Sequence, residues 1–279
     1  MNPQSMRFPG GTLRALTLSY DDGVQQDLRL IELMNATGLR ATFNLNSGCF
    51  SPEGTVFPQG QIHRRFSRSE ALNVYARGPH EIAIHGTMHA HPCTLSAQER
   101  EYDFRQDRLN LEAMFSRIIR GAAYAYGEYN EDTISTLRSS GIVYARTVHS
   151  THDFQIPQDF LRLNPTCHHD DPMLFDLLDR FLDPGVCTPH LFYLWGHSYE
   201  FEEHRNWDRI ETFARSAGGR KDVWYCTNQE LYTYVQSFRS LIESADRQQL
   251  LNPSAIPLYL EHHGEVLCIG PGRRISLPS

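Results

Sequence analysis

The chain has 279 residues, 40% of them apolar and 21% charged, which is typical of a globular protein with one domain or two smaller ones. A net charge of −7 and a pI near 6.0 argue against nucleic acid or an anionic membrane as partner. The opening MNPQSMRFPGG lacks an apolar signal region, no apolar run could span a membrane, and the six cysteines are scattered, so we expect a cytoplasmic protein with free thiols.

Short apolar runs alternate with longer amphipathic stretches along the chain. The strand candidates are residues 13–20, 39–46, 80–85, 122–126, 142–148, 190–197 and 222–227. The helix candidates are residues 26–38, 95–121, 130–141, 171–182 and 206–219. Ser96 and Glu99 have capping-box spacing, and Gly38 stands where a C-terminal cap belongs. This alternation predicts a parallel α/β sheet with crossover helices, either open or closed into an irregular barrel.

The last part of the sequence has a different pattern. From about residue 250, apolar and polar residues alternate around His263-Gly264, which predicts a β-hairpin appended to the main domain. We therefore expect a main domain over residues 1–250 and a hairpin over residues 251–279 that packs on or beside it. A subunit contact is an equally open role for this hairpin.

The first strand ends in LSYDDG (18–23), with two adjacent aspartates. Two carboxylates at the end of an apolar strand repel each other and are partly desolvated, unless a cation or a proton compensates. The carboxyl ends of parallel strands are where ligands bind in α/β folds. On its own, this stretch also fits a solvated turn in which Asp21 caps the next helix.

The third strand candidate ends in HEIAIHGTMHAHP (80–92), which is rich in histidine. One turn after the strand places His85 and His89 on one side, where two neutral imidazoles can hold a divalent metal. A His-rich surface loop is the alternative. Combined with a carboxylate from the first strand, the two histidines form a set that leaves metal positions open for water and substrate. One aspartate would then bind the metal, and the other would serve as base for the activated water.

The motifs SYDDG, HGTMH, YAYGEYN and LWGHSYEF, in that order, resemble the polysaccharide deacetylase (NodB-homology) family, which is carbohydrate esterase family four. The resemblance covers roughly residues 12–235. It implies a distorted (β/α)7 barrel over residues 1–250, in agreement with the seven strand candidates. It also implies that Asp21 is the catalytic base and that Asp22, His85 and His89 bind the metal.

The stretch AAYAYGEYN (122–130) resembles the family's third motif only in part. Tyr126 and Gly127 match, whereas Ala123 and Ala125 replace the motif's arginine and proline. The resemblance implies that this arginine pairs with the base, so another group must balance the charge of Asp21. A backbone N–H at Tyr126 would still stabilise an oxyanion.

Two later stretches add candidates. The family's late motif implies that His197 in LFYLWGHSYEF is the general acid, which suits protonation of a leaving amine; a buried core histidine is the alternative. Trp195 is a candidate for a sugar subsite or for the core. In NPTCHHDD, which we place in an irregular segment, His168 or His169 is a candidate for the missing positive charge. We treat the remaining histidines, His63 among them, as surface or structural residues.

Together these features predict a metal-dependent hydrolase that removes an N-acetyl group from a carbohydrate, acting on a carbon–nitrogen bond that is not a peptide bond. Zinc is the expected metal, and cobalt, nickel or iron would suit the same ligands. One alternative is a hydrolase of a linear or cyclic non-carbohydrate amide. Another is a sugar-binding relative that has lost the chemistry.

Overall fold

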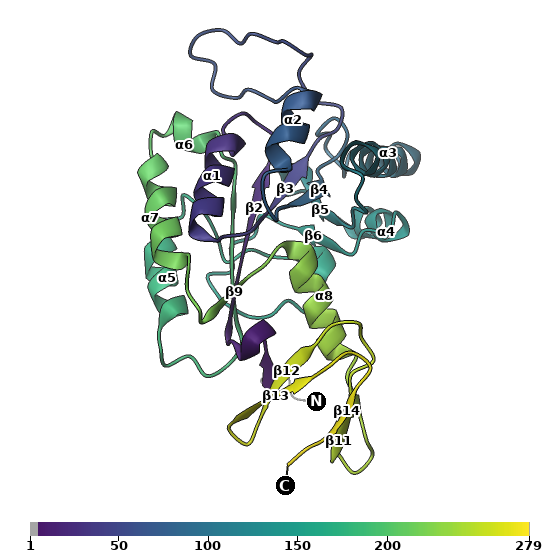
Figure 1. Cartoon of the computed structure of the whole chain (residues 1–279). Helices are drawn as coiled ribbons and strands as arrows, with labels where there is room; N and C mark the ends of the chain where they lie inside the picture. Colours follow the sequence, from purple (N-terminus) through teal and green to yellow (C-terminus); the bar gives the residue numbers. More distant parts are fainter. Residues whose placement is uncertain (1–4, 279) are drawn as a thin grey trace.

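The computed structural model describes residues 5–278, and its centre is a curled sheet of parallel strands with helices packed around it (Figure 1). The strand order is β6-β5-β4-β3-β2-β8-β7, and β9 pairs with the first half of β2. The strands are β2 (Arg14–Asp21), β3 (Ala41–Leu45), β4 (Glu81–Ile84), β5 (Gly121–Ala123), β6 (Tyr144–Arg146), β7 (Cys167–His168), β8 (His190–Gly196) and β9 (Val223–Tyr225). This is the distorted (β/α) barrel that the sequence predicts.

The register of the sheet brings the ends of its central strands to one edge. Asp21 at the end of β2 pairs with Asn44 of β3, and Tyr20 pairs with Gly196 of β8. Alternate residues of a strand face opposite sides of the sheet. In β2, Tyr20 therefore joins the core beneath the helices, whereas Asp21 faces the inside of the barrel.

Helices follow most of the strands and cover the outside of the sheet. They are α1 (Asp27–Thr37), α2 (Arg68–Tyr75), α3 (Ala97–Phe115), α4 (Glu131–Ser139), α5 (Leu174–Leu182), α6 (Glu200–Glu203), α7 (Trp207–Ala217) and α8 (Asn228–Arg239). The predicted capping box at Ser96 and Glu99 is present, and Gly38 ends α1 with a left-handed backbone. Buried apolar side chains of the sheet and helices form the main core, so this packing fixes where the strand ends lie.

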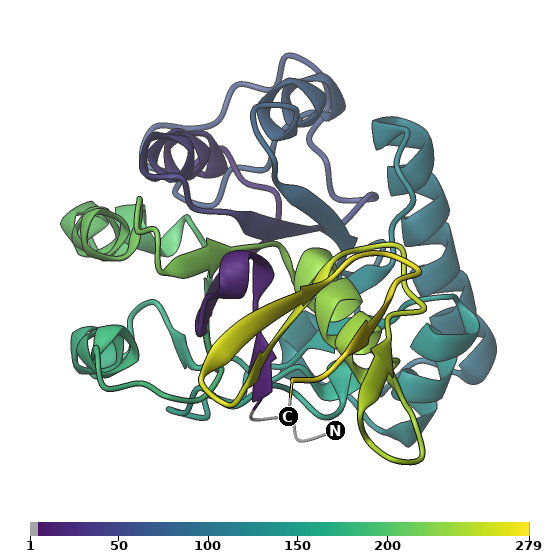
Figure 2. The ribbon, with the colours of Figure 1, turned by 60° about the horizontal axis from the view of Figure 1, so that its bottom comes forward.

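The predicted C-terminal hairpin is also present, and it belongs to a larger appendage. Strands β12 (Leu258–His262) and β13 (Glu265–Ile269) turn at His263-Gly264, and β12 also pairs with β1 (Met6–Arg7). A second small sheet contains β10 (Ile242–Glu243), β11 (Gln249–Leu251) and β14 (Arg274–Ser276). Figure 2 shows the C-terminal strands beside the N-terminal strand, at the end of the barrel opposite the loop that precedes α2. The domain boundary at residue 250 stays a prediction.

Several elements differ from the sequence-based expectation. Strand β7 lies in the segment that we expected to be irregular, because two residues are too short to give a period-two signal. Helices α2 and α8 were not predicted, although Ser67 with Glu70 and Thr227 with Glu230 form capping boxes that would have indicated them. Helix α3 ends at Phe115 rather than near residue 121, because Ser116 adopts a left-handed backbone.

Candidate metal centre and active site

The two aspartates at the end of β2 point in different directions. Asp21 is the last residue of the strand, and Asp22 leaves it with a left-handed backbone, φ 83°. Both side chains are buried, with 2% exposure for Asp21 and 7% for Asp22. The change of backbone direction separates the carboxylates, but His85 lies close to both, with its Nε2 3.7 Å from Asp21 Oδ2.

The carboxylate of Asp22 faces the two histidines that follow β4. One ligand atom each from Asp22, His85 and His89 lies within 4.8 Å of the others. The Nε2 atoms of His85 and His89 are 3.2 Å apart, and His89 Nε2 lies 3.8 Å from Asp22 Oδ1. The structure thus brings the three predicted metal ligands together.

The surroundings of the histidines leave their Nε2 atoms available to a cation. His85 Nδ1 lies 2.9 Å from the Ala123 carbonyl, so this nitrogen carries the proton and Nε2 has the free lone pair. Burial lowers the pKa of His85 and, together with the His85 ring, lowers the pKa of His89 to about 4. Neutral imidazoles beside an ionised carboxylate are the donor set of a transition metal, so these residues fit one.

Helix α3 anchors the turn that carries both histidines. The Asp107 carboxylate accepts hydrogen bonds from the backbone N–H groups of Ser47 and His85, at 2.8 and 3.0 Å. The neighbouring Asp103 accepts one from the Thr87 N–H at 2.9 Å. The turn after β4 is therefore held at two points, and no sequence pattern indicated either anchor.

Asp21 pairs with an arginine that sequence reasoning missed. The guanidinium of Arg146, at the end of β6, donates a hydrogen bond to Asp21 Oδ2, and Asn44 donates one to Oδ1 at 2.7 Å. Arg146 is fully buried. Burial alone would raise the pKa of Asp21, but Arg146 and then His85 lower it below its usual value. Asp21 is therefore ionised, as a base must be.

This arrangement corrects our hypothesis for the missing positive charge. Arg146 is the last residue of β6 and pairs with Ala123 of β5, so its guanidinium reaches Asp21 although Ala123 replaces the motif's arginine. His168 and His169 do not contact Asp21; each places Nε2 3.2 Å from Glu200 Oε2. A lone arginine in YARTV (144–148) gave no sequence signal, because only the parallel register of β5 and β6 brings it to the site.

His197 follows β8, which pairs with β2 on the side away from β4, the strand that precedes His85 and His89. Its Nε2 is 3.8 Å from Asp21 Oδ2, and its Nδ1 is 3.2 Å from Glu200 Oε1. Burial favours the neutral ring, yet Glu200 and Asp21 raise the pKa of His197 above its usual value. Glu200 is therefore a contact point for three histidines, and its side chain orients the candidate acid.

The remaining predicted residues form the surroundings of these groups. The Trp195 ring lies 4.3 Å from the Arg146 guanidinium carbon and is largely buried. Tyr126 is half exposed and stacks on His91 with ring centres 3.8 Å apart. Gly127 has φ 69°, and a Cβ there would lie 2.3 Å from Val148 Cγ2, so only glycine fits this turn.

A loop before α2 adds two further contacts to Asp22. His63 Nε2 lies 3.2 Å from Asp22 Oδ2, and Arg65 Nη2 donates to Asp22 Oδ1 at 2.9 Å. Our treatment of His63 as a surface or structural residue overlooked this contact. The pairing is long-range in the sequence, so no local pattern marks it.

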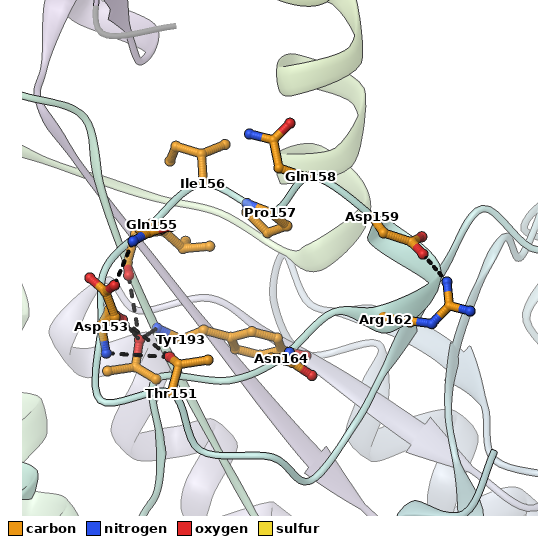
Figure 3. Close-up of a pocket in the computed structure, with 12 residues that line it drawn as sticks. Thr151, Asp153, Gln155, Ile156, Pro157, Gln158, Asp159, Arg162, Asn164 and Tyr193 are labelled. Carbon is orange, nitrogen blue, oxygen red and sulfur yellow. Dashed lines mark hydrogen bonds and ion pairs between the residues drawn. The ribbon is translucent and has the colours of Figure 1, made fainter. Parts of the chain in front are cut away.

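A separate pocket of about 310 Å³ lies beside β8 (Figure 3). Its lining comes from the segment between β6 and β7, including Thr151 and Asn164, and from Leu191 and Tyr193 of β8. The predicted site residues do not line it. We therefore assign it no part in the chemistry proposed below.

Two further findings concern the cysteines and the possibility of a membrane-spanning helix. All six cysteines are free. Among the residues that the structure describes, no helix is both long and apolar enough to cross a membrane.

A curled (β/α) sheet with an Asp-His-His cluster at the carboxyl ends of its strands defines a class of barrel proteins with a candidate metal-dependent hydrolytic site. The model of the polysaccharide deacetylase family matches residues 8–145, which include Asp21, Asp22, His85, His89 and Tyr126. Over residues 8–145 the chain therefore belongs to the polysaccharide deacetylase family.

Solved structures share the fold at low sequence identity. A Mycobacterium smegmatis protein named as a polysaccharide deacetylase has a TM-score of 0.60 and 16% identity, over 86% of this chain and 96% of its own. A family 4 carbohydrate esterase from Streptomyces lividans, in complex with acetate, has a TM-score of 0.50 and 13% identity, over 76% of this chain and 92% of its own. No curated protein sequence gives a significant match to the chain.

Proposed function

We propose that this protein is a metal-dependent hydrolase that removes the acetyl group from an N-acetylated carbohydrate. The observation that carries the proposal is the ionised, buried Asp21 directly beside the Asp22, His85 and His89 cluster. A metal site and an adjacent base are the two parts that metal-assisted amide hydrolysis requires. The family to which the chain belongs supports the carbohydrate substrate.

Asp22, His85 and His89 would hold one divalent transition metal, with zinc expected and cobalt, nickel or iron able to use the same ligands. When bound, such a metal polarises a carbonyl group and makes water a better nucleophile. The anchors at Ala123 and Asp107 keep the histidine turn in place before a cation arrives.

The other groups have roles that follow from their positions. Asp21, kept ionised by Arg146, accepts the proton of the attacking water. His197, oriented by Glu200, gives a proton to the leaving amine. A backbone N–H at Tyr126 would stabilise the oxyanion, and Trp195, whose ring contacts His168, would line a sugar subsite.

The class of substrate is a separate question from the type of reaction. A carbohydrate or other small N-acetylated molecule is the expected partner, and we expect a cytoplasmic enzyme acting on soluble oligosaccharides. A hydrolase of a linear or cyclic amide is the second candidate, because Ala123 and Ala125 depart from the family's third motif. A catalytically silent sugar-binding protein is disfavoured by the complete ligand set, which would have no use in binding alone.

The first experiment is elemental analysis of the purified wild type and His89→Ala, combined with acetate release from N-acetylated oligosaccharides and a panel of small amides. We expect about one equivalent of metal in the wild type and its loss in His89→Ala. Asp21→Asn should retain the metal and lose at least about 1,000-fold in turnover. A wild type that binds no added zinc or cobalt contradicts the metal site, and a near-fully active Asp21→Asn contradicts the base.

A further inference from the structure

We propose that Arg65 is a positioning residue that holds the metal ligand Asp22 in its binding geometry; this inference rests on the proposed metal site. Three hydrogen bonds support it. Arg65 Nη2 donates to Asp22 Oδ1 at 2.9 Å, and Nη1 donates to the Asp22 carbonyl and, at 2.7 Å, to Asn46 Oδ1. One guanidinium thus holds both the side chain and the backbone of the ligand.

Asp22 needs such support because its backbone is unfavourable. With φ 83° it adopts a backbone conformation that residues other than glycine rarely take. The conformation persists only when the surroundings hold it in place, and it is this turn that aims the carboxylate at His89. The Arg65 contact to the Asp22 carbonyl acts directly on the strained peptide.

Asn46 extends the same network to the histidine ligands. Its amide donates to the carbonyls of His85 and Gly86, at 2.7 and 2.8 Å, while its oxygen accepts from Arg65. Asn46 is 1% exposed, so water does not replace these bonds. Arg65 and Asn46 therefore connect the end of β2 to the end of β4, which are the two segments that carry the metal ligands.

The loop that carries Arg65 is fixed independently of this side chain. The Gln25 N–H donates to the Arg64 carbonyl at 2.7 Å, and the Phe66 N–H donates to the Gly23 carbonyl at 3.1 Å. The Arg64 guanidinium pairs with both oxygens of Glu202, at 3.0 and 2.8 Å. A substitution at Arg65 should consequently act on Asp22 without releasing the loop.

Charge alone would give Arg65 the opposite effect. A guanidinium at 2.9 Å from a ligand oxygen repels an arriving cation, so its removal would strengthen metal binding if electrostatics decided the outcome. The geometric role predicts the reverse, because residues that orient metal ligands typically contribute about 10- to 100-fold to affinity. The two effects therefore differ in sign and can be separated.

The test is titration of the metal-free protein with Zn²⁺ by calorimetry against a competing chelator, together with the Co²⁺ absorption spectrum. Arg65→Lys keeps the charge but not the two-pronged geometry, and Arg65→Gln removes the charge. We expect both to bind Zn²⁺ at least about 10-fold more weakly than the wild type, with a changed Co²⁺ spectrum in Arg65→Lys. Arg68→Gln, at the exposed first residue of α2, should bind within about twofold of the wild type.

The outcomes separate this inference from the proposed function. Binding by Arg65→Lys within twofold of the wild type, or tighter binding by Arg65→Gln, overturns the positioning role. A wild type that binds no metal contradicts the proposed function instead. Circular dichroism monitors folding, and if Arg65→Gln is unfolded, Arg65→Lys alone decides.

Discussion

The half of the site that we propose binds the metal, formed by Asp22, His85 and His89 and called the metal half below, is anchored at many points. Each of these residues or its turn has a partner on another element, from Asp107 on α3 to Arg65 on the loop before α2. Each of these partners holds a different segment, so the geometry of the three residues depends on several side chains and not on one.

The acid half, formed by His197 and Glu200, is held differently. Glu200 Oε1 lies at His197 Nδ1, and its Oε2 accepts from the His197 N–H at 3.1 Å. His168 and His169 meet the same carboxylate. One side chain therefore sets the orientation of His197, so a single substitution at Glu200 should disturb this half without acting on the metal half.

After Asp21 itself, Arg146, whose guanidinium pairs with the Asp21 carboxylate, should show the largest effect of a single substitution on turnover. Arg146→Gln leaves the buried Asp21 carboxylate without its cation, which typically costs about 3–5 kcal/mol of stability. We expect turnover to fall at least about 100-fold, because a carboxylate without this partner takes up a proton more readily. Urea unfolding and acetate release would measure both effects.

Arg162→Gln is the control, because its partners Asp159 and Glu131 lie on the surface. It should change stability by less than about 1 kcal/mol. Equal losses of stability and turnover in Arg146→Gln and Arg162→Gln would show that Asp21 does not depend on Arg146.

Glu200→Gln tests the dependence of the acid half on one carboxylate. Glutamine carries no charge to pair with the His197 ring, and it accepts more weakly from the His197 backbone N–H, so His197 loses its orientation. We expect kcat to fall about 10- to 100-fold, with unchanged metal content. Kinetics and elemental analysis on the same preparation provide both readouts.

Glu203→Gln, on the exposed side of the same short helix, should retain wild-type kinetics. Loss of metal in Glu200→Gln would mean that the two halves are not separate.

Gly127→Ala should have a smaller effect on turnover. It adds strain at φ 69° and a Cβ at 2.3 Å from Val148 Cγ2, next to the candidate oxyanion position at Tyr126. We expect a loss of about 1–3 kcal/mol in stability and a change of a few fold in kcat. Thermal unfolding and acetate release would measure the two quantities.

Gly38→Ala is a matched control for strain alone, since Gly38 has φ 73° with no atom near the added Cβ. It should cost about 1 kcal/mol. The double variant Gly127→Ala/Val148→Ala should regain the stability that Gly127→Ala loses beyond Gly38→Ala. No regain would mean that the clash with Val148 is relieved in another way.

The difference between local motifs and long-range contacts explains how much of the site the sequence could predict. DDG and HGTMH place their residues within one turn of a strand end, so the position of Asp22, His85 and His89 follows from the barrel pattern alone. Arg146 and Arg65 act on residues far away in the chain, and only the register of β5 and β6 and the path of the loop bring them close. Glu200 lies three residues from His197, yet its role depends on a four-residue helix that no periodicity reveals. Partners that lie far apart in the sequence could therefore be identified only from the structure.

Asp27 should have the smallest effect on turnover, and it tests whether buried carboxylates outside both halves matter to stability. Its side chain is fully buried and accepts hydrogen bonds from Tyr75 and, at 2.6 Å, from Ser198. Burial raises the pKa of Asp27 from 3.8 to about 7, with a further contribution from the negative charge of Asp22. The folded protein thus retains a proton that the unfolded chain releases near pH 4.

The sign of the pH dependence follows from that difference. Because the folded state binds more protons between pH 4 and pH 7, Asp27 makes stability fall as pH rises through this window, by at most about 1.4 kcal/mol per pH unit, and has no further effect above it. Asp27→Asn removes this contribution, so urea unfolding from pH 4.5 to 8.5 should show a smaller decline for the variant than for the wild type below pH 7, and parallel curves above. Asp179→Asn, on the exposed face of α5, should follow the wild-type curve throughout. Parallel curves for Asp27→Asn and the wild type across the whole range would mean that Asp27 is ionised in the folded protein, and its hydrogen bonds from Tyr75 and Ser198 would then outweigh its burial.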